Sequence, residues 1–263
     1  MFFIRSGAGA PPLVLVHGFA CAHQDWVAQV AHFSAHHDVV ACDLRGHGQT
    51  PGRPHECTIA HFAGDVAALA ANLELPGAVL VGHSMGCRVV VEAARLDPER
   101  LAGLVLIDGS FMGTGDPAQA EAAMRQALAT TGYAAFAEAL FRRMFLAESP
   151  VSRAIVARAR ALPAEVGANL FPNMVRWDIE QMPTALAAVR VPLLVIQSTY
   201  VNAERQRASM KAGQSTPWLD LVRSKVPGAR IEIIPDAGHF PQIENAAEVN
   251  RLIEGFLGGL EPR

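Results

Sequence analysis

The segment Gly82-His83-Ser84-Met85-Gly86 contains the residue types and spacing that most directly suggest chemistry in this chain. The β-rich run AVLVGH leads into the serine and the helical pattern MGCRVVVEAARL follows it. This is the strand, turn and helix context of a G-x-S-x-G nucleophile elbow. The turn is sharp, so glycines flank the serine where Cβ atoms would not fit, and a helix N-terminus faces the serine. The pattern therefore predicts Ser84 as a nucleophile.

A serine hydroxyl is a weak nucleophile, and it needs a general base to take its proton. His239, in DAGHF, follows the last β-rich run, RIEIIP. Parallel strands end at one edge of a sheet, so this position brings the imidazole to the edge where Ser84 lies. Among the ten histidines of the chain, we therefore predict His239 as the base.

Short apolar runs alternate with helical patterns along most of the chain. Six runs read as buried parallel strands: 13–17, 38–43, 78–83, 101–108, 191–197 and 230–235. Helical patterns lie around 24–35, 59–73, 85–96 and 244–257. This alternation predicts an α/β fold: a doubly wound, mostly parallel sheet with helices on both faces. Its site should lie at the carboxyl ends of the strands.

The alternation stops between Ser110 and Arg190. Prolines punctuate Ala-rich helical segments there, such as PAQAEAAMRQALAT and YAAFAEALFRRMF. We expect a helical cap at 111–190, inserted into a core formed by 1–110 and 191–263. Its Met and aromatic side chains could line a substrate tunnel, although packing against the core is their more usual role.

The chain resembles the α/β-hydrolase fold family over nearly its whole length. The resemblance rests on LVLVHGFA, DLRGHG, VGHSMG, LVLID and DAGHFPQIENAAEV, which occur in the family's order. It implies attack of the elbow serine on a carbonyl, without a metal or an organic cofactor. It also implies an oxyanion hole formed by the backbone N–H groups of Phe19 and Met85. His17, His47 and His83 resemble the family's turn and packing histidines.

The carboxylate that orients the histidine is where the chain departs from the commonest family pattern. That pattern has an Asp in the turn after the strand VPLLVIQ, whereas the turn here reads STYVNAER. Asp108 ends the preceding strand, LAGLVLID, which resembles certain haloalkane dehalogenases and fungal lactonases whose acid lies there. We predict Asp108 as the orienting acid. The alternatives are Glu204, expected to open a helix, Asp220, expected within one, and Asn202 as a polar partner.

Composition narrows the classes of partner. The chain has 263 residues and a formal net charge of -3, without the basic stripe that nucleic acids or anionic membranes require. No apolar run reaches membrane-spanning length, and the N-terminal segment does not read as a signal peptide, so we expect a soluble, cytoplasmic protein. The four cysteines lack C-x-x-C spacing and should be buried thiols. A small molecule is the expected partner, and the oligomeric state stays open.

The leading hypothesis is hydrolysis of a carboxylic ester or lactone of a small, largely apolar substrate through an acyl-enzyme. Carbon–carbon cleavage of a diketone-like substrate stays open, because similar capped enzymes use the same triad. A third alternative is cofactor-free dioxygenation of an N-heteroaromatic ring. Similar dioxygenases place histidines where this chain has Met85 and Phe19-Ala20-Cys21. A non-enzymatic receptor would leave Ser84 and His239 without a role.

Overall fold

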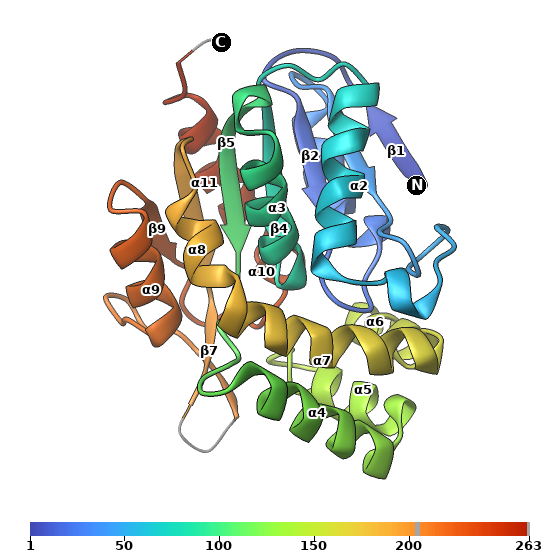
Figure 1. Ribbon diagram of the computed structural model, residues 1–263. Coiled ribbons are helices and arrows are strands. Elements are labelled where there is room, and N and C mark those ends of the chain that lie inside the picture. The colour runs from blue at the N-terminus through green and yellow to red at the C-terminus, as the bar shows by residue number, and fades with distance from the viewer. Residues whose placement is uncertain (203–205, 262–263) are drawn as a thin grey trace.

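The computed structural model describes residues 1–202 and 206–261. Within them, seven strands form the central sheet in the order β1-β3-β2-β4-β5-β6-β9 (Figure 1). These strands are β1 Phe3–Ser6, β2 Leu13–Val16, β3 Val39–Cys42, β4 Ala78–His83, β5 Leu101–Ile107, β6 Leu193–Gln197 and β9 Arg230–Ile233. Only β1 runs antiparallel to its neighbour, and the other pairs are parallel. The predicted mostly parallel sheet is confirmed.

Strand β1 was not among the predicted strands. It is four residues long, FIRS, and it pairs with β3 at the edge of the sheet. So short a segment has no alternating pattern long enough to distinguish it from a loop. Its pairing with β3, more than thirty residues further along the chain, comes from tertiary structure.

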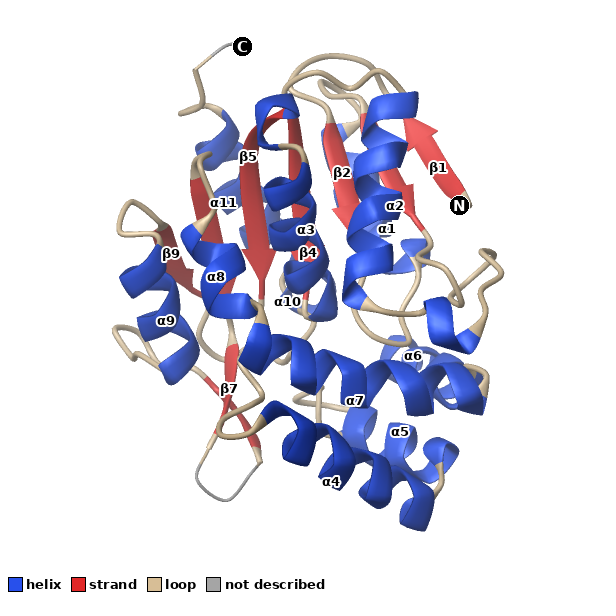
Figure 2. Ribbon diagram, viewed as in Figure 1, coloured by secondary structure: helices blue, strands red, loops and turns tan. Residues whose placement is uncertain are grey.

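Helices cover both faces of the sheet, as Figure 2 shows. One face carries α2, α3, α8 and α9, which contact one another in succession, and the other carries α1 and α11. Their bounds are α1 Val27–Phe33, α2 Ile59–Asn72, α3 Met85–Leu96, α8 Met182–Ala187, α9 Pro217–Lys225 and α11 Ala246–Leu257, with the short α10 Pro241–Glu244 before the last of these. The doubly wound arrangement is therefore confirmed.

The core lies in two layers because successive side chains of a strand point to opposite faces. In β2, Val14 and Val16 join the apolar cluster beneath α2 and α3. Leu13 and Leu15 join the second cluster, with residues of α1 and α11. Both faces are covered, so β2 is buried along its whole length, and this explains its unbroken apolar run.

A helical insertion separates β5 from β6. Its helices are α4 Pro117–Thr131, α5 Tyr133–Arg142, α6 Pro150–Ala161, α7 Ala164–Glu180 and α8. Side chains cap two of them, because Asp116 accepts from the backbone N–H of Gln119 and Ser149 from that of Ser152. Helices α4 to α7 lie beneath the carboxyl ends of the strands (Figure 1). Among the described residues, no helix is long and apolar enough to cross a membrane.

A small antiparallel hairpin follows β6 directly. Its strands are β7 Thr199–Val201 and β8 Arg207–Ser209. Glu204, which was expected to open a helix, lies outside the described residues. Asp220 lies within α9, as predicted.

The four cysteines are all buried and unpaired, as predicted. Burial raises the pKa of the Cys42 and Cys87 thiols to about 12, so both stay protonated near neutral pH. In the ranges 1–202 and 206–261, no group of three His, Cys, Asp or Glu side chains is arranged to hold a metal ion.

Candidate active site

Ser84 lies in the turn between β4 and α3, and its backbone is in an unusual conformation. Its φ is 54° and its ψ is -112°, values that a residue with a Cβ rarely adopts. The strand before it and the helix after it hold the turn in place. The sharp turn predicted around Ser84 is therefore present.

The glycines on either side of Ser84 are required by close backbone contacts. A Cβ added at Gly82 would lie 2.4 Å from the carbonyl oxygen of Gly86. A Cβ added at Gly86 would lie 2.3 Å from the carbonyl oxygen of Val16, on the neighbouring strand. Both distances are far inside van der Waals contact, so larger side chains would displace backbone.

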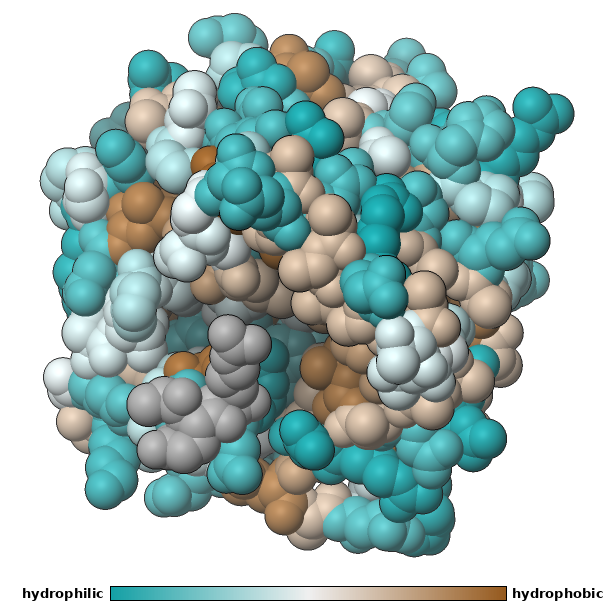
Figure 3. Space-filling model, turned by 60° about the horizontal axis from the view of Figure 1, so that its bottom comes forward, coloured by the Kyte–Doolittle hydropathy of each residue, from teal (hydrophilic) through white to brown (hydrophobic). Residues whose placement is uncertain are grey.

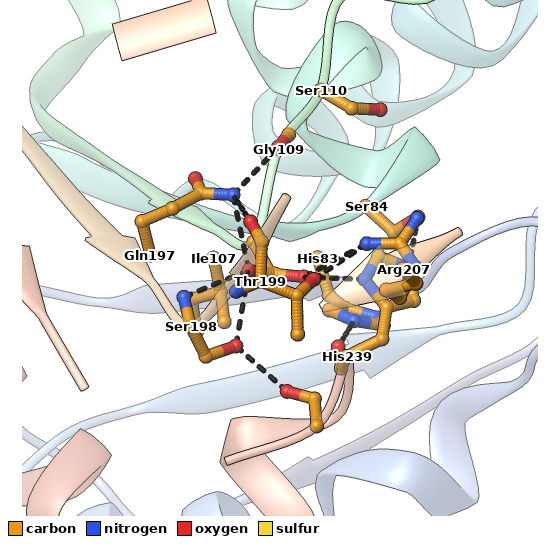
Figure 4. A network of polar contacts seen from close by, with 12 residues as sticks. His83, Ser84, Ile107, Gly109, Ser110, Gln197, Ser198, Thr199, Arg207 and His239 are labelled. Carbon is orange, nitrogen blue, oxygen red and sulfur yellow. Dashed lines mark hydrogen bonds and ion pairs between the residues drawn. The ribbon is translucent and has the colours of Figure 1, made fainter. Parts of the chain in front are cut away.

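A continuous series of hydrogen bonds joins Ser84, His239 and Asp108. Figure 4 shows the polar network around them, with Ser84, His239 and Arg207 labelled. The Nε2 atom of His239 lies 2.8 Å from the Ser84 Oγ. The Nδ1 atom lies 2.5 Å from the Asp108 Oδ2. Since Asp108 accepts at Nδ1, that nitrogen bears the proton, and Nε2 is left to accept from the serine hydroxyl.

The backbone of His239 is held from two sides. Its N–H donates to the carbonyl oxygen of Met144, in the helical insertion, over 2.7 Å. Its carbonyl oxygen accepts from the His83 Nε2, also over 2.7 Å. Burial lowers the pKa of His83 to about 3, with the nearby His239 adding to the effect, so His83 stays neutral. It therefore acts as a neutral hydrogen-bond donor that holds the His239 backbone.

The Asp108 carboxylate is surrounded by donors from the segment that follows β6. Its Oδ1 accepts from the backbone N–H groups of Ser198 at 2.8 Å and Thr199 at 2.7 Å. The Gln197 side chain and the Ser198 hydroxyl add two further bonds to Oδ1. Its Oδ2 accepts from the Thr199 hydroxyl and lies 3.3 Å from the Arg207 Nη1. The STY segment, which lacks the expected Asp, thus supplies donors to an acid on the neighbouring strand.

These contacts keep Asp108 ionised although it is fully buried. Burial alone would raise its pKa, but the His239 hydrogen bond and the charges of His239 and Arg207 lower it to about 2. For His239, burial is the largest effect and Arg207 the next, and they lower its pKa to about 4 despite the Asp108 carboxylate. At neutral pH the site therefore holds a neutral imidazole and an ionised carboxylate.

The two residues predicted to form an oxyanion hole, Phe19 and Met85, belong to segments that border Ser84. Met85 is the first residue of α3, where a backbone N–H has no acceptor within the helix. Phe19 lines the Ser84 pocket, in a turn closed by the Cys21 N–H and the Gly18 carbonyl. Gly18 packs so tightly that a Cβ there would lie 3.2 Å from the Ser84 Cβ. The turn is thus fixed against the serine.

The pocket over Ser84 is narrow and mostly apolar. Its volume is about 40 Å³, and the helical insertion contributes Leu140, Phe141, Met144, Phe171 and Met174 to its lining. The Phe19 ring packs edge-on against Phe171, with centroids 5.2 Å apart. Trp177 is buried in the same apolar cluster but is not part of the lining.

Two of the alternative partners for His239, Asp220 and Asn202, make their hydrogen bonds elsewhere. The exposed Asp220 carboxylate accepts from the Ser215 hydroxyl. Asn202 accepts through its side chain from the backbone N–H of Gln206, within its own hairpin. Nothing is described for Glu204.

Two arginines of the site were not singled out in the sequence. Arg88, in α3, is buried and makes a two-pronged ion pair with Asp178 of α7 at 2.7 Å. Its Nη2 also donates to the Ser110 carbonyl. Arg207, in β8, lines the same pocket. Arg88 could have been predicted from the sequence, because it lies one helical turn after Ser84. Arg207 could not, because only the hairpin brings it to the site.

Comparison with known proteins identifies a family and several structural neighbours. A family model described as "Alpha/beta hydrolase family" matches residues 13–252. A thermophilic esterase from Thermogutta terrifontis is 27% identical, with a TM-score of 0.80 over 98% of this chain and 92% of that one. An enol-lactonase from Burkholderia xenovorans LB400 is 26% identical, with a TM-score of 0.77 over 98% of this chain and 96% of that one.

The sequence relatives include a protein with a different named activity. The dihydrolipoyllysine-residue acetyltransferase component of the acetoin cleaving system from Cupriavidus necator is 29% identical over 98% of this chain. The chain spans 66% of the length of that protein. The similarity therefore does not extend to the remaining third of that protein.

Proposed function

This chain belongs to the alpha/beta hydrolase family, and on that premise we propose that it is a serine hydrolase acting on a carboxylic ester or lactone of a small, largely apolar substrate. The observation that carries the proposal is the hydrogen-bonded series from Ser84 through His239 to Asp108, at the floor of an apolar pocket. The esterase and the enol-lactonase among its structural neighbours support the same reaction class.

In the acylation step, the Ser84 Oγ attacks the carbonyl carbon while its proton passes to the His239 Nε2. The carbonyl π electrons move to oxygen, and the backbone N–H groups of Phe19 and Met85 donate to this oxyanion. When the carbonyl re-forms, the bond to the leaving oxygen breaks. His239 gives its proton to that oxygen, and Ser84 carries the acyl group.

In the deacylation step, His239 takes a proton from water as the water oxygen attacks the acyl carbon. Collapse of the second oxyanion breaks the bond to the Ser84 Oγ, which recovers its proton from His239. Asp108 accepts from Nδ1 throughout, which fixes the tautomer and stabilises the imidazolium that forms in both steps. The serine proton leaves with the alcohol and a proton from water replaces it, so Ser84 and His239 end the cycle in their starting protonation states.

The division of the chain into a core, 1–110 with 191–263, and a cap, 111–190, is part of the proposal. Cap side chains such as Phe141 close the pocket over Ser84, whereas Ser84, His239 and Asp108 all belong to the core. A pocket of about 40 Å³ holds only a few non-hydrogen atoms, so the cap side chains limit which groups fit directly over Ser84. The size and shape of the group that fits over Ser84 should therefore depend mainly on the cap.

Substitution of the two reacting residues tests the proposal. Ser84→Ala should abolish both labelling by a fluorophosphonate probe and hydrolysis of p-nitrophenyl butyrate, because the Oγ is the attacking atom. His239→Ala should lower kcat by about a thousandfold or more, because the serine loses its base. The exposed Ser224→Ala and His55→Ala are the matched controls and should behave as the parent does.

Labelling that persists in Ser84→Ala would place the nucleophile on another residue. A panel of esters, lactones and a diketone-like carbon–carbon substrate then identifies the bond that is cleaved. Turnover of the diketone alone would replace ester hydrolysis with carbon–carbon cleavage by the same three residues.

A further inference from the structure

Arg207 lies between the Ser84 pocket and a second cavity. The second cavity has a volume of about 440 Å³ and shares Ser110, Met112 and Arg207 with the pocket over Ser84. Its other lining residues include Phe111, Tyr200 and Trp218. The space-filling view of this end of the molecule shows a deep recess with both hydrophilic and hydrophobic side chains (Figure 3). A group attached to an ester bound at Ser84 could therefore extend past Arg207 into this cavity.

The guanidinium of Arg207 is only partly engaged by the residues that the structure describes. Its Nη1 donates to the Thr199 hydroxyl over 2.5 Å and lies 3.3 Å from the Asp108 Oδ2. Within 1–202 and 206–261, these two acceptors contact Nη1 alone. A guanidinium has five N–H donors on three nitrogens. The Nε and Nη2 edge of the group has the geometry that binds a carboxylate with two hydrogen bonds.

Arg88 shows what a fully engaged arginine looks like in the same pocket. Its Nε and Nη2 bind both carboxylate oxygens of Asp178, and Nη2 also bonds to the Ser110 carbonyl. Its side chain is 1% exposed, against 15% for Arg207. Arg88 is therefore a structural cation, whereas Arg207 makes no comparable two-pronged ion pair with any residue of 1–202 or 206–261.

The charge of Arg207 opposes the chemistry proposed for this site. After burial, it is the strongest of the effects that lower the pKa of His239, because a nearby cation disfavours the imidazolium. Among the described residues, other charged or titratable groups near His239 include Asp108 just after β5, Arg88 on α3 and His83 on β4. Asp108 is already hydrogen-bonded to the imidazole, so it does not cancel the effect of Arg207 in full. An anion bound to Arg207 would offset this cost at the moment the imidazolium forms.

We propose that Arg207 is a specificity residue that binds an anionic group of the substrate, so that the natural substrate is an ester or lactone carrying a carboxylate. This inference rests on the proposed hydrolase function and refines its substrate class by adding one anionic group to an otherwise largely apolar molecule. The carboxylate lies in the second cavity, beside the aromatic side chains, while the carbonyl lies against Ser84. The negative charge of the carboxylate binds the substrate to Arg207. The same charge stabilises the His239 imidazolium, which makes His239 a better base.

Matched pairs of charged and neutral esters test this inference. Mono-(4-nitrophenyl) adipate carries the carboxylate on the acyl side, and 4-butyryloxybenzoate carries it on the alcohol side. Each is compared with its own methyl ester, and the Ser84→Ala rate is subtracted as background. We expect at least one acid to exceed its methyl ester in kcat/KM by about tenfold or more, the size of a charge-assisted hydrogen-bonded pair. Part of the gain should lie in kcat.

Arg207→Met should remove that preference by lowering kcat/KM for the acid far more than for the methyl ester. Arg207→Lys should restore part of it, because lysine keeps the charge but not the two-pronged geometry. Arg143→Met, an exposed arginine of the cap, is the matched control and should keep the parent preference. Melting temperatures of all variants show whether a loss reflects folding, and a folding defect alone would lower both members of a pair equally.

Two results would overturn the inference: neither acid is preferred, or Arg207→Met keeps the preference. These results differ from a failure of the proposed function, which would appear as probe labelling or ester turnover that survives in Ser84→Ala. An enzyme that loses all activity in Ser84→Ala but ignores substrate charge would refute only the role of Arg207.

Discussion

The environment of Asp108 is the most informative feature at the scale of single residues. Its φ is 45°, a left-handed conformation that places the carboxylate among the backbone N–H groups that follow β6. The His239 hydrogen bond and the charges of His239 and Arg207 hold its pKa low in a site where burial would otherwise raise it. Its second oxygen remains available to the His239 Nδ1.

Replacing Asp108 should damage catalysis more than folding. Asp108→Asn should lower kcat by about a thousandfold or more, because the carboxamide can hold His239 in the wrong tautomer and carries no charge for the imidazolium. Asp220→Asn, in the exposed part of α9, should leave kcat within about twofold of the parent. A kcat near the parent value in Asp108→Asn would show that another group orients the histidine.

The pH profile should report the lowered pKa of His239. The imidazole must be neutral to accept the Ser84 proton, and its pKa is about 4. The rate kcat/KM on a neutral ester should therefore stay near its maximum as the pH falls from 7 to about 5, and should be halved near pH 4. Arg207→Met should move this midpoint upward, because removal of the cation favours the imidazolium. A midpoint between 6 and 7 in the parent would contradict the assignment, provided that circular dichroism shows a folded protein.

At the scale of elements, the Arg88–Asp178 pair links the helix that carries Ser84 to the insertion above it. Arg88 lies on α3 and Asp178 on α7, and both side chains are almost fully buried. Asp178 also accepts from the backbone N–H of Met112, at the start of the insertion. The pair thus fixes where α7 crosses the carboxyl ends of the strands.

Breaking this pair from one side should be costly, because it leaves a buried charge without a partner. Asp178→Asn should lower the free energy of unfolding in urea by about 3–5 kcal/mol. The exposed pair between Arg251 and Glu248 is the control, and Glu248→Gln should cost less than about 1 kcal/mol. Equal effects of the two substitutions would mean that the buried pair does not hold the insertion in place.

At the scale of the whole molecule, several buried histidines make the fold sensitive to acid. Burial lowers the pKa of His17 well below its usual value and that of His47 to about 4. His83 follows the same pattern, with a pKa of about 3. In the unfolded chain such groups take up protons near pH 6.5, whereas the folded chain excludes these protons until a much lower pH.

Stability should therefore be greatest above about pH 6.5 and should fall as the pH drops toward 4. Each excluded proton lowers the free energy of unfolding by at most about 1.4 kcal/mol per pH unit. Urea unfolding at pH 7.5, 6.0 and 5.0 measures the slope. His47→Gln should reduce it, whereas His55→Gln should not, because His55 is exposed. A flat profile in the parent would mean that these histidines bind protons in the folded state.

The sequence alone determined the features that depend on neighbouring residues. Runs of a few residues are enough to predict the turn at Ser84, the alternation of strands and helices, and the helical insertion between β5 and β6. Local propensity and burial pattern specify such elements wherever they fall in the fold. The same signals were too weak for β1, which is short, and for the hairpin after β6, where Glu204 was expected to open a helix.

Only the tertiary structure decided which side chains meet. Asp108 and His239 are separated by 131 residues and Ser84 and His239 by 155, so their contacts depend on how β4, β5 and β9 align in the sheet. The donors around Asp108 and the position of Arg207 depend likewise on the hairpin that follows β6. Hydrogen bonds act over about 3 Å, and no local pattern specifies distances that small between segments so far apart in the chain.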